Sequence, residues 1–263
     1  MRLRQGVLAG IVVAVLQIGP ALAQESPPPD DRVGQVGSVA ISRADFDHWF
    51  AAASHARFQR PMEFVAPAYE RCAAAKRKLR TKRGWRKLSE RELRARCTRD
   101  HRELRRQVMQ FLVQGQWVEQ EAAARGVVLS ERRVRQIFEA QKQKVFPKER
   151  AYQRFLRESG ATEPDILHRI RLDALQNRVT RHVTRQAEPV TAKDVARFRA
   201  DHPGWFKGMG AKANRRIRRL LVTAREQIAL GRFIDDFRKR YRAMTWCADG
   251  YAIAECGAIA PPS

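Results

Sequence analysis

The stretch from Ser89 to Gly126 constrains the fold most strongly, because it predicts one very long helix. Ser89 and Glu92 have the spacing of a capping box, and Gly126 is a typical C-terminal stop. Apolar or small residues recur at helical spacing over about seven or eight turns, namely Leu93, Cys97, Leu104, Val108, Phe111, Leu112, Gly115 and Val118. Other helices must cover so long an apolar stripe, so the sequence favours a multi-helix fold.

Start and stop signals predict further helices along most of the chain. Capping boxes, in which Ser or Thr precedes an acidic residue by three positions, also begin at Ser42, Thr162 and Thr191. Three of the expected helices have both bounds, at about 64–79, 89–125 and 211–243. Four others are placed by their first residue, near Ser42, Ser130, Thr162 and Thr191, and a short one is placed by its end at Gly160. Gly and Pro residues separate these segments.

β-structure is predicted only near the N-terminus. In the segment VGQVGSVAIS, residues 33–42, short apolar runs flank Gly37-Ser38, which predicts two short strands joined by a tight turn. The last segment, 244–263, is rich in Gly and Pro and is expected to be irregular. The predicted fold class is mainly α, with a short N-terminal β ribbon and a long C-terminal helix.

The first residues carry the pattern of an export signal. Arg2 and Arg4 precede an apolar run, and Ala-Leu-Ala before Gln24 is a typical cleavage site, so 1–23 is expected to be a signal peptide cleaved after Ala23. An uncleaved anchor is the alternative, because the apolar run is only slightly shorter than a membrane span. Residues 24–32 form a Pro-rich leader. The expected location is periplasmic, cell-wall-associated or secreted.

The chain is strongly basic. Its formal net charge of +24 falls to +22 when Arg2 and Arg4 leave with the signal peptide. Such a charge usually indicates nucleic acid or another anionic partner. Export argues against nucleic acid, and many arginines are scattered over expected helices, so a solvated helix surface is favoured over a dedicated anionic site. Weak contact with anionic lipid headgroups or cell-wall polymers follows from the same charge.

Four cysteines in an exported chain favour disulfides. No Cys-x-x-Cys pair is present, as a zinc site would require, and no metal or other cofactor is expected. We expect the pairs Cys72–Cys97 and Cys247–Cys256, and the two crossed pairings are the alternatives. In the chain-entropy model these loops are worth about 3.5 and 2.7 kcal/mol. Cys97 and His101 could instead form a thiol–imidazole pair, but an oxidised thiol is no nucleophile.

The segment HPGWFKGMGAKAN, residues 202–214, lies between two expected helices. GMGAK before a helix could offer backbone N–H groups and Lys212 to a phosphate. However, no apolar strand precedes it, and the G-x-x-x-x-G-K spacing of a phosphate-binding loop is absent. We therefore interpret the segment as a connector.

Several segments, taken in order, resemble the SurA-like and PrsA-like foldases, which are exported chaperones of unfolded proteins. VGQVGSVAISRADFDHWF resembles their opening, and QVMQFLVQGQWVEQEAAARGVVLSERRVRQIFE is similar to their next signature. FPKERAYQRFLRESGATEPDILHRIRLDALQNRV and EPVTAKDVARFRADHPGWF resemble the following blocks. FRKRYRAMTWCADGYAIAECG resembles the tail of actinobacterial members. The resemblance covers 33 to about 206, and about 211 to 257.

The resemblance has one gap. Full-length relatives carry a parvulin-type prolyl isomerase domain between the last two segments, where this chain has only KGMGAK. The resemblance therefore implies a SurA N-terminal-like helical chaperone domain at 33–206. A connector and C-terminal helix at 207–243 would complete this domain, and a Cys-clipped tail would follow at 244–263. It implies a chaperone without the isomerase active site.

A chaperone of this kind needs an apolar concave surface and no catalytic residues. The candidate contacts with an unfolded client are Trp49, Phe50, Phe111, Trp117, Phe138 and Phe206. Core packing is the alternative for each, because aromatic residues at helical spacing are usually buried. The expected function is an exported chaperone of unfolded or nascent exported polypeptides, acting as a monomer or weak dimer without specific nucleic acid. The alternatives are a prolyl isomerase and a basic envelope protein that binds anionic cell-wall or lipid groups.

Overall fold

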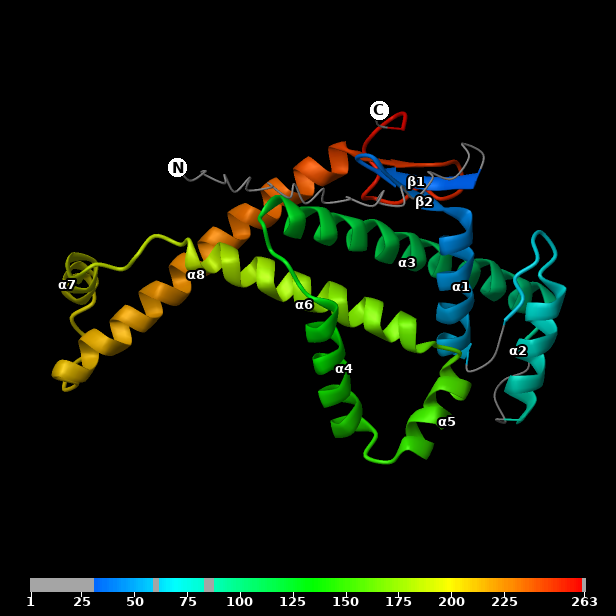
Figure 1. Cartoon of the computed structure of the whole chain (residues 1–263), viewed down its shortest axis with the longest axis horizontal. Helices are drawn as coiled ribbons and strands as arrows, with labels where there is room; N and C mark the ends of the chain where they lie inside the picture. The colour runs from blue at the N-terminus through cyan, green and yellow to red at the C-terminus, as the bar shows by residue number, and fades with distance from the viewer. Residues whose placement is uncertain (1–30, 59–61, 83–87, 262–263) are drawn as a thin grey trace, which may run out of the picture.

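The computed structural model describes residues 31–58, 62–82 and 88–261 (Figure 1). The predicted signal peptide and most of the Pro-rich leader lie outside these residues. The described chain is mostly helical with one small sheet, so the predicted mainly α fold is confirmed. Within the described ranges, no helix is both long enough and apolar enough to cross a membrane.

The helices follow the predicted order. They are α1 (Arg43–Phe58), α2 (Glu70–Lys82), α3 (Glu90–Ala124), α4 (Glu131–Val145), α5 (Glu149–Ser159), α6 (Glu163–Arg185), α7 (Ala192–Asp201) and α8 (Ala211–Ala243). The capping boxes of α3, α6 and α7 make both of their hydrogen bonds. α2 begins at Glu70 rather than near residue 64, because the chain turns at 66–68 and Tyr69 has a φ of 53°.

The sheet has one strand more than predicted. β1 (Arg32–Val36) and β2 (Val39–Ser42) form the expected hairpin, and Gly37 in its turn has a φ of 56°, which costs glycine little. β3 (Thr245–Cys247) pairs antiparallel with the other edge of β1, giving the order β2-β1-β3. The expectation of an irregular tail is therefore wrong for Thr245–Cys247.

α3 is the helix that the other elements cover. It contacts α1, α2 and α6, and the β1–β2 hairpin lies against it. Residues along its apolar stripe pack into different hydrophobic clusters. Cys97 packs with the start of α2, and Val108 lies in the core with β1, β2 and α1. Further along, Ala122 packs with α4, α5 and α6. The long stripe is thus buried by several partners in turn, as its length required.

α8 joins two parts of the molecule. Ala213 and Ile217, both 0% exposed, pack its first turns against α7. Phe237 and Tyr241 bring its last turns into the core beneath the sheet. Figure 1 shows α7 and the start of α8 at the end of the molecule that lies away from the sheet. The C-terminal helix therefore packs back on the N-terminal helices, as predicted.

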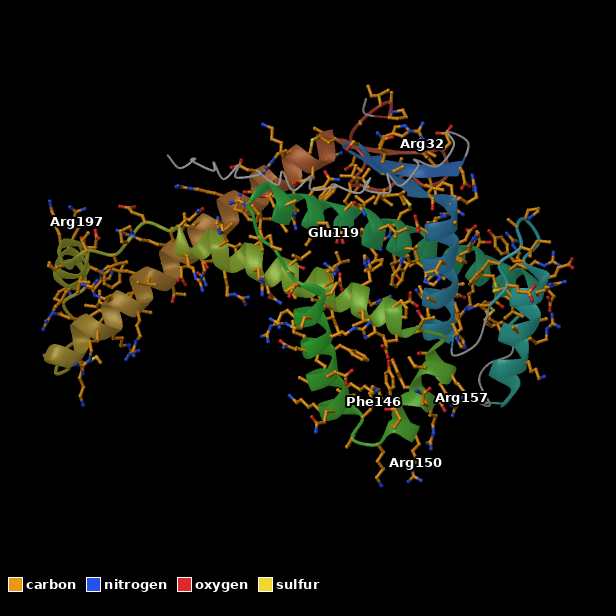
Figure 2. The ribbon with its side chains drawn as sticks, viewed as in Figure 1. Arg32, Glu119, Phe146, Arg150, Arg157 and Arg197 are labelled. Carbon is orange, nitrogen blue, oxygen red and sulfur yellow. A yellow bond between two sulfur atoms is a disulfide. The ribbon has the colours of Figure 1, made fainter. Side chains whose placement is uncertain are left out.

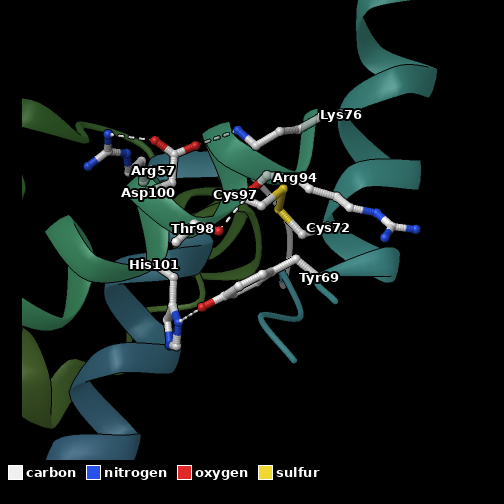
Figure 3. The surroundings of a disulfide bond; sticks show 9 residues. All are labelled: Arg57, Tyr69, Cys72, Lys76, Arg94, Cys97, Thr98, Asp100 and His101. Atoms are coloured by element: carbon white, nitrogen blue, oxygen red, sulfur yellow. Dashed lines mark hydrogen bonds and ion pairs between the residues drawn. A yellow bond between two sulfur atoms is a disulfide. The ribbon is translucent and has the colours of Figure 1, made fainter. Parts of the chain in front are cut away.

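The cysteines lie in the two sequential pairs. The Sγ atoms of Cys72 and Cys97 are 1.99 Å apart, and those of Cys247 and Cys256 are 1.93 Å apart. The first pair ties α2 to α3 (Figure 3), and the second joins β3 to the tail. Cys97 is fully buried. No thiol is therefore left at this position to pair with His101.

A buried carboxylate ties α1 to the start of α6. Asp165 is 6% exposed and accepts hydrogen bonds from the backbone N–H of Thr162 at 2.9 Å and from His48 Nε2 at 2.6 Å. Burial acts to raise the pKa of Asp165, but the hydrogen bonds from Thr162 and His48 outweigh it and hold this pKa below its usual value. The ionised form of Asp165 therefore stabilises the folded chain.

We predict that Asp165→Asn lowers the free energy of unfolding at pH 7 by about 1–2 kcal/mol, because a charge-assisted hydrogen bond is lost. The pKa of Asp165 is lower in the folded chain than in the unfolded chain. Its contribution is therefore complete above about pH 4 and disappears as the pH falls through the folded-state pKa. Urea unfolding of wild type and variant, at pH 7 and at an acid pH below the folded-state pKa of Asp165, measures this difference.

Asp173→Asn is the matched control for this prediction. Asp173 is exposed on the same helix and makes no ion pair within the described residues. Its replacement should change the unfolding free energy little at either pH. If the difference in unfolding free energy between wild type and Asp165→Asn were as large in acid as at pH 7, the assigned role of the carboxylate would be contradicted.

Candidate binding groove

A groove lies between α3, α6 and α8. Its cavity volume of about 460 Å³ is within the range of ligand-binding sites. Most of its lining is apolar and consists of Phe111, Trp117, Val118, Leu172, Val179, Leu230, Phe233, Ile234 and Phe237. The polar lining consists of Gln114, Gln176, Thr180, Asp173 and Arg238 at the edge and of the buried Glu121. An apolar cavity with a few polar groups at its edge is the usual form of a binding site.

α8 supplies a wall of the groove that the sequence analysis did not assign to client binding. Leu230, Phe233, Ile234 and Phe237 recur at the spacing of one helix face. All four are half-buried, although they pack beside α6. Apolar side chains that stay half-exposed beside a cavity keep surface that a bound chain can cover. The repeat was visible in the sequence, but periodicity does not distinguish a core from a groove.

A close approach of α3 and α6 forms another part of the groove. A Cβ atom on Gly115 would lie 3.1 Å from Leu172 Cδ1, which is tighter than ordinary packing. Glycine therefore lets the two helices meet where a larger side chain would press on Leu172. Because both residues also line the groove, this contact fixes its width.

A second hollow lies between α1, α3 and α6 and shares Phe111 with the groove. Its volume is about 570 Å³. The rings of Trp49 and Phe111 meet here, with centroids 4.7 Å apart. The Arg169 guanidinium lies 5.1 Å from each ring, so a cation covers this aromatic pair. Two of the predicted contact residues are thus brought together, but at a partly covered surface.

Three other predicted contact residues line neither hollow. Phe50 is half-buried and packs against Phe64 and His101. Phe138 is 2% exposed in the core of α4, α5 and α6, and Phe206 is 6% exposed in the core of α7 and α8. These aromatic side chains therefore pack in cores outside the groove.

Trp117, the sixth predicted contact residue, fixes β3 and α8 to α3. It lines the groove although only 4% of it is exposed. Its Nε1 donates a hydrogen bond to Thr245 Oγ1 at 2.8 Å, and Thr245 Oγ1 donates to the carbonyl oxygen of Tyr241 at 2.7 Å. All three residues are buried, so the polar atoms of this contact satisfy one another away from water.

A buried carboxylate next to Trp117 strengthens the same junction. Glu121 on α3 is 1% exposed, and its Oε1 lies 2.5 Å from Arg125 Nε. Its Oε2 lies 3.2 Å from Arg240 Nη1 on α8. Burial, together with the charge of Glu121, raises the pKa of Tyr241 to about 12, so the Tyr241 hydroxyl stays protonated at neutral pH. The carboxylate is stable in this position only while its cations remain.

We predict that Arg125→Met lowers the free energy of unfolding by about 2–3 kcal/mol, because the Glu121 carboxylate stays buried and loses one of its two cations, keeping Arg240. Methionine keeps an unbranched apolar chain against Phe233, over which the Arg125 guanidinium lies at 4.7 Å. Urea unfolding followed by circular dichroism measures the loss.

Arg106→Met is the matched control for this prediction. Arg106 pairs with Glu103 at 2.7 Å on the same helix, but both side chains are exposed, at 50% and 38%. Its removal should cost less than about 1 kcal/mol. Equal effects of the two substitutions would show that the buried charge network does not hold α8 to α3.

Comparison with known proteins places the chain in a family. A family model described as SurA-like N-terminal domain matches residues 3–180. No curated protein and no solved structure matches the chain. In the described residues, no group of three or more His, Cys, Asp or Glu side chains is placed to hold a metal ion.

Proposed function

Since the chain belongs to the family of SurA-like N-terminal domains, we propose that it is an exported chaperone that holds unfolded polypeptides in the groove between α3, α6 and α8. The family is one of chaperone-like folding factors. The observation that carries the proposal is the half-exposed apolar wall of α8, which faces apolar side chains of α3 and α6 across the groove.

The groove supports binding through burial of apolar side chains. An unfolded client exposes the leucine, isoleucine and aromatic side chains that its folded form buries. Each side chain that enters the groove removes apolar surface from water, and this burial contributes about 25 cal/mol of favourable free energy per Å². One or two side chains in about 460 Å³ give weak, exchangeable binding. Folding of the client buries the same side chains and therefore competes with the groove, so release needs no energy source.

Polar groups at the edge of the groove support contact with the client backbone. Gln176 carries a side-chain amide that can both donate to and accept from peptide groups. Gln114 Nε2 already donates to Glu255 Oε1 at 2.9 Å, and the Gln114 amide oxygen can still accept a hydrogen bond. Such contacts do not depend on the client's sequence. The groove therefore combines a preference for apolar side chains with tolerance for different clients.

The proposal assigns no isomerase activity to the chain. Only residues 202–210 connect α7 to α8, which leaves no room for the parvulin domain of full-length relatives. The described residues contain no sheet other than the small one formed by β1, β2 and β3. Phe111 and Trp117 are proposed as client contacts together with the α8 wall, and Trp49 as a contact in the second hollow.

We predict that the protein binds lysozyme kept unfolded by reduction and alkylation, and binds native lysozyme much more weakly. Lysozyme is basic, so attraction to the basic surface of the chaperone does not contribute. Ile234→Gln should weaken binding about fivefold, because it removes part of the apolar wall. Fluorescence anisotropy of labelled lysozyme at physiological and high salt measures the affinity.

Ile228→Gln is the matched control for the groove variant. Ile228 lies on the same helix, is 55% exposed and does not line the groove. Its replacement should leave the affinity nearly unchanged. Equal weakening by both substitutions would remove the groove as the site. Binding that occurs only with acidic clients and vanishes at high salt would favour the basic envelope protein instead.

A further inference from the structure

The tip formed by α7, the connector and the first turns of α8 carries a dense positive charge. From 191 to 225 the chain has ten Lys and Arg residues and two Asp residues. In the described part of the chain, Arg197, Arg215, Arg216 and Arg219 form no ion pair. Figure 2 shows Arg197 at the outer end of this tip. The charge is therefore concentrated at one end of the molecule, where Arg225 pairs with Asp194 at 3.0 Å but these four arginines have no acidic partner in the described residues.

A hollow of about 520 Å³ lies between α7 and α8 within this charge. Its floor on α7 is made by three alanines, Ala192, Ala196 and Ala200, whose small side chains leave space open. The arginines that line it are Arg199, Arg215 and Arg218, and no carboxylate does so. A space of this kind, bordered by three guanidinium groups, suits a phosphate group.

Two of these arginines are held in place by the protein. Arg218 Nη1 donates to the carbonyl oxygen of Val190 at 2.6 Å, and Arg199 Nη1 donates to Asn214 Oδ1 at 3.1 Å. Each guanidinium has five N–H groups, so most of its donors remain for an anion. Fixing the side chains beforehand lowers the entropy lost on binding.

An exposed indole lies in the connector of this tip. Trp205 is 69% exposed; its ring lies tilted beside the ring of His202, with centroids 4.5 Å apart, and edge-on to Phe198. Leu220 on α8 is a further exposed apolar residue, at 47%. Tryptophan favours the boundary between lipid headgroups and acyl chains, and cations beside it favour anionic headgroups. A soluble polyanion without aromatic rings, such as polyphosphate, would account for the charge but not for the indole.

We propose that the α7–α8 tip binds the surface of a membrane that contains anionic phospholipids. Headgroup phosphates occupy the hollow bordered by Arg199, Arg215 and Arg218, and Trp205 enters the headgroup layer. The groove is formed by later turns of α8, about 25 Å further along the helix, so it stays open while the tip is bound. This inference does not depend on the proposed chaperone function.

The test is sedimentation of the full chain with vesicles of phosphatidylcholine alone or mixed with phosphatidylglycerol, at low salt. We expect binding to the mixed vesicles only. The triple variant Arg199→Gln, Arg215→Gln, Arg218→Gln should bind on the order of a hundredfold more weakly, at roughly fivefold for each basic residue. Trp205→Ala should weaken binding several-fold and remove the fluorescence change that vesicles cause.

The matched control is the triple variant Arg132→Gln, Arg150→Gln, Arg154→Gln, with the same loss of charge on α4 and α5. These arginines are exposed and make no ion pair within the described residues, and Figure 2 shows Arg150 far from the tip. The binding of this control variant to the mixed vesicles should change little.

The double variant Arg197→Gln, Arg219→Gln removes charge from the tip but keeps the contacts of Arg199 and Arg218. Like the first triple variant, it should bind more weakly than wild type. Circular dichroism checks that each variant folds.

Three results would overturn the proposal. The first is no binding to phosphatidylglycerol at low salt, and the second is an equal loss in the two triple variants. The third is inorganic polyphosphate bound as tightly as the mixed vesicles, with no effect of Trp205→Ala on either ligand. That result would assign the tip to a soluble polyanion.

Discussion

The buried contact between α3 and the end of α8 determines the shape of the rest of the molecule. Glu121, with Arg125 and Arg240 beside it, lies next to the hydrogen bond from Trp117 to Thr245. These residues bring the C-terminal strand onto β1 and hold the last turns of α8 in the core. Because the first turns of α8 are fixed to α7, the middle of the helix stands beside α6 as a wall. The groove exists because α8 is anchored at both ends.

Most of the helical fold could be predicted because its signals are local. The capping boxes at Ser89, Thr162 and Thr191 mark helix starts within four residues of sequence, and α8 spans the predicted 211–243. β3 could not be predicted, because three residues carry no pattern and pair with a strand about two hundred positions earlier. The lining of the candidate groove could be predicted only in part. Phe111 and Trp117 were expected as client contacts and do line it, but periodicity could not show that Phe233 and Ile234 face the same cavity.

The physical properties that the proposed chaperone function requires compete in this chain with those of a stable protein. A groove that binds exposed apolar side chains must keep its own apolar wall half-exposed, and such surfaces favour aggregation. The net charge of +24 opposes this tendency, because like-charged molecules repel one another. The charge is also unevenly distributed, with the tip of α7 and α8 separated from the groove along one helix. The proposed binding of clients and the proposed binding of an anionic membrane use separate parts of the molecule, so neither would obstruct the other.

The central claim, that unfolded clients lie in the groove between α3, α6 and α8, is tested most directly by photo-crosslinking. Benzoylphenylalanine placed at Gln176, which is exposed at the edge of the groove, probes the site without disturbing its apolar lining. The same group at Gln143, exposed on α4, is the control. The account predicts efficient crosslinks to reduced and alkylated lysozyme from position 176, few from 143, and few to native lysozyme from either. Equal yields from the two positions would contradict it.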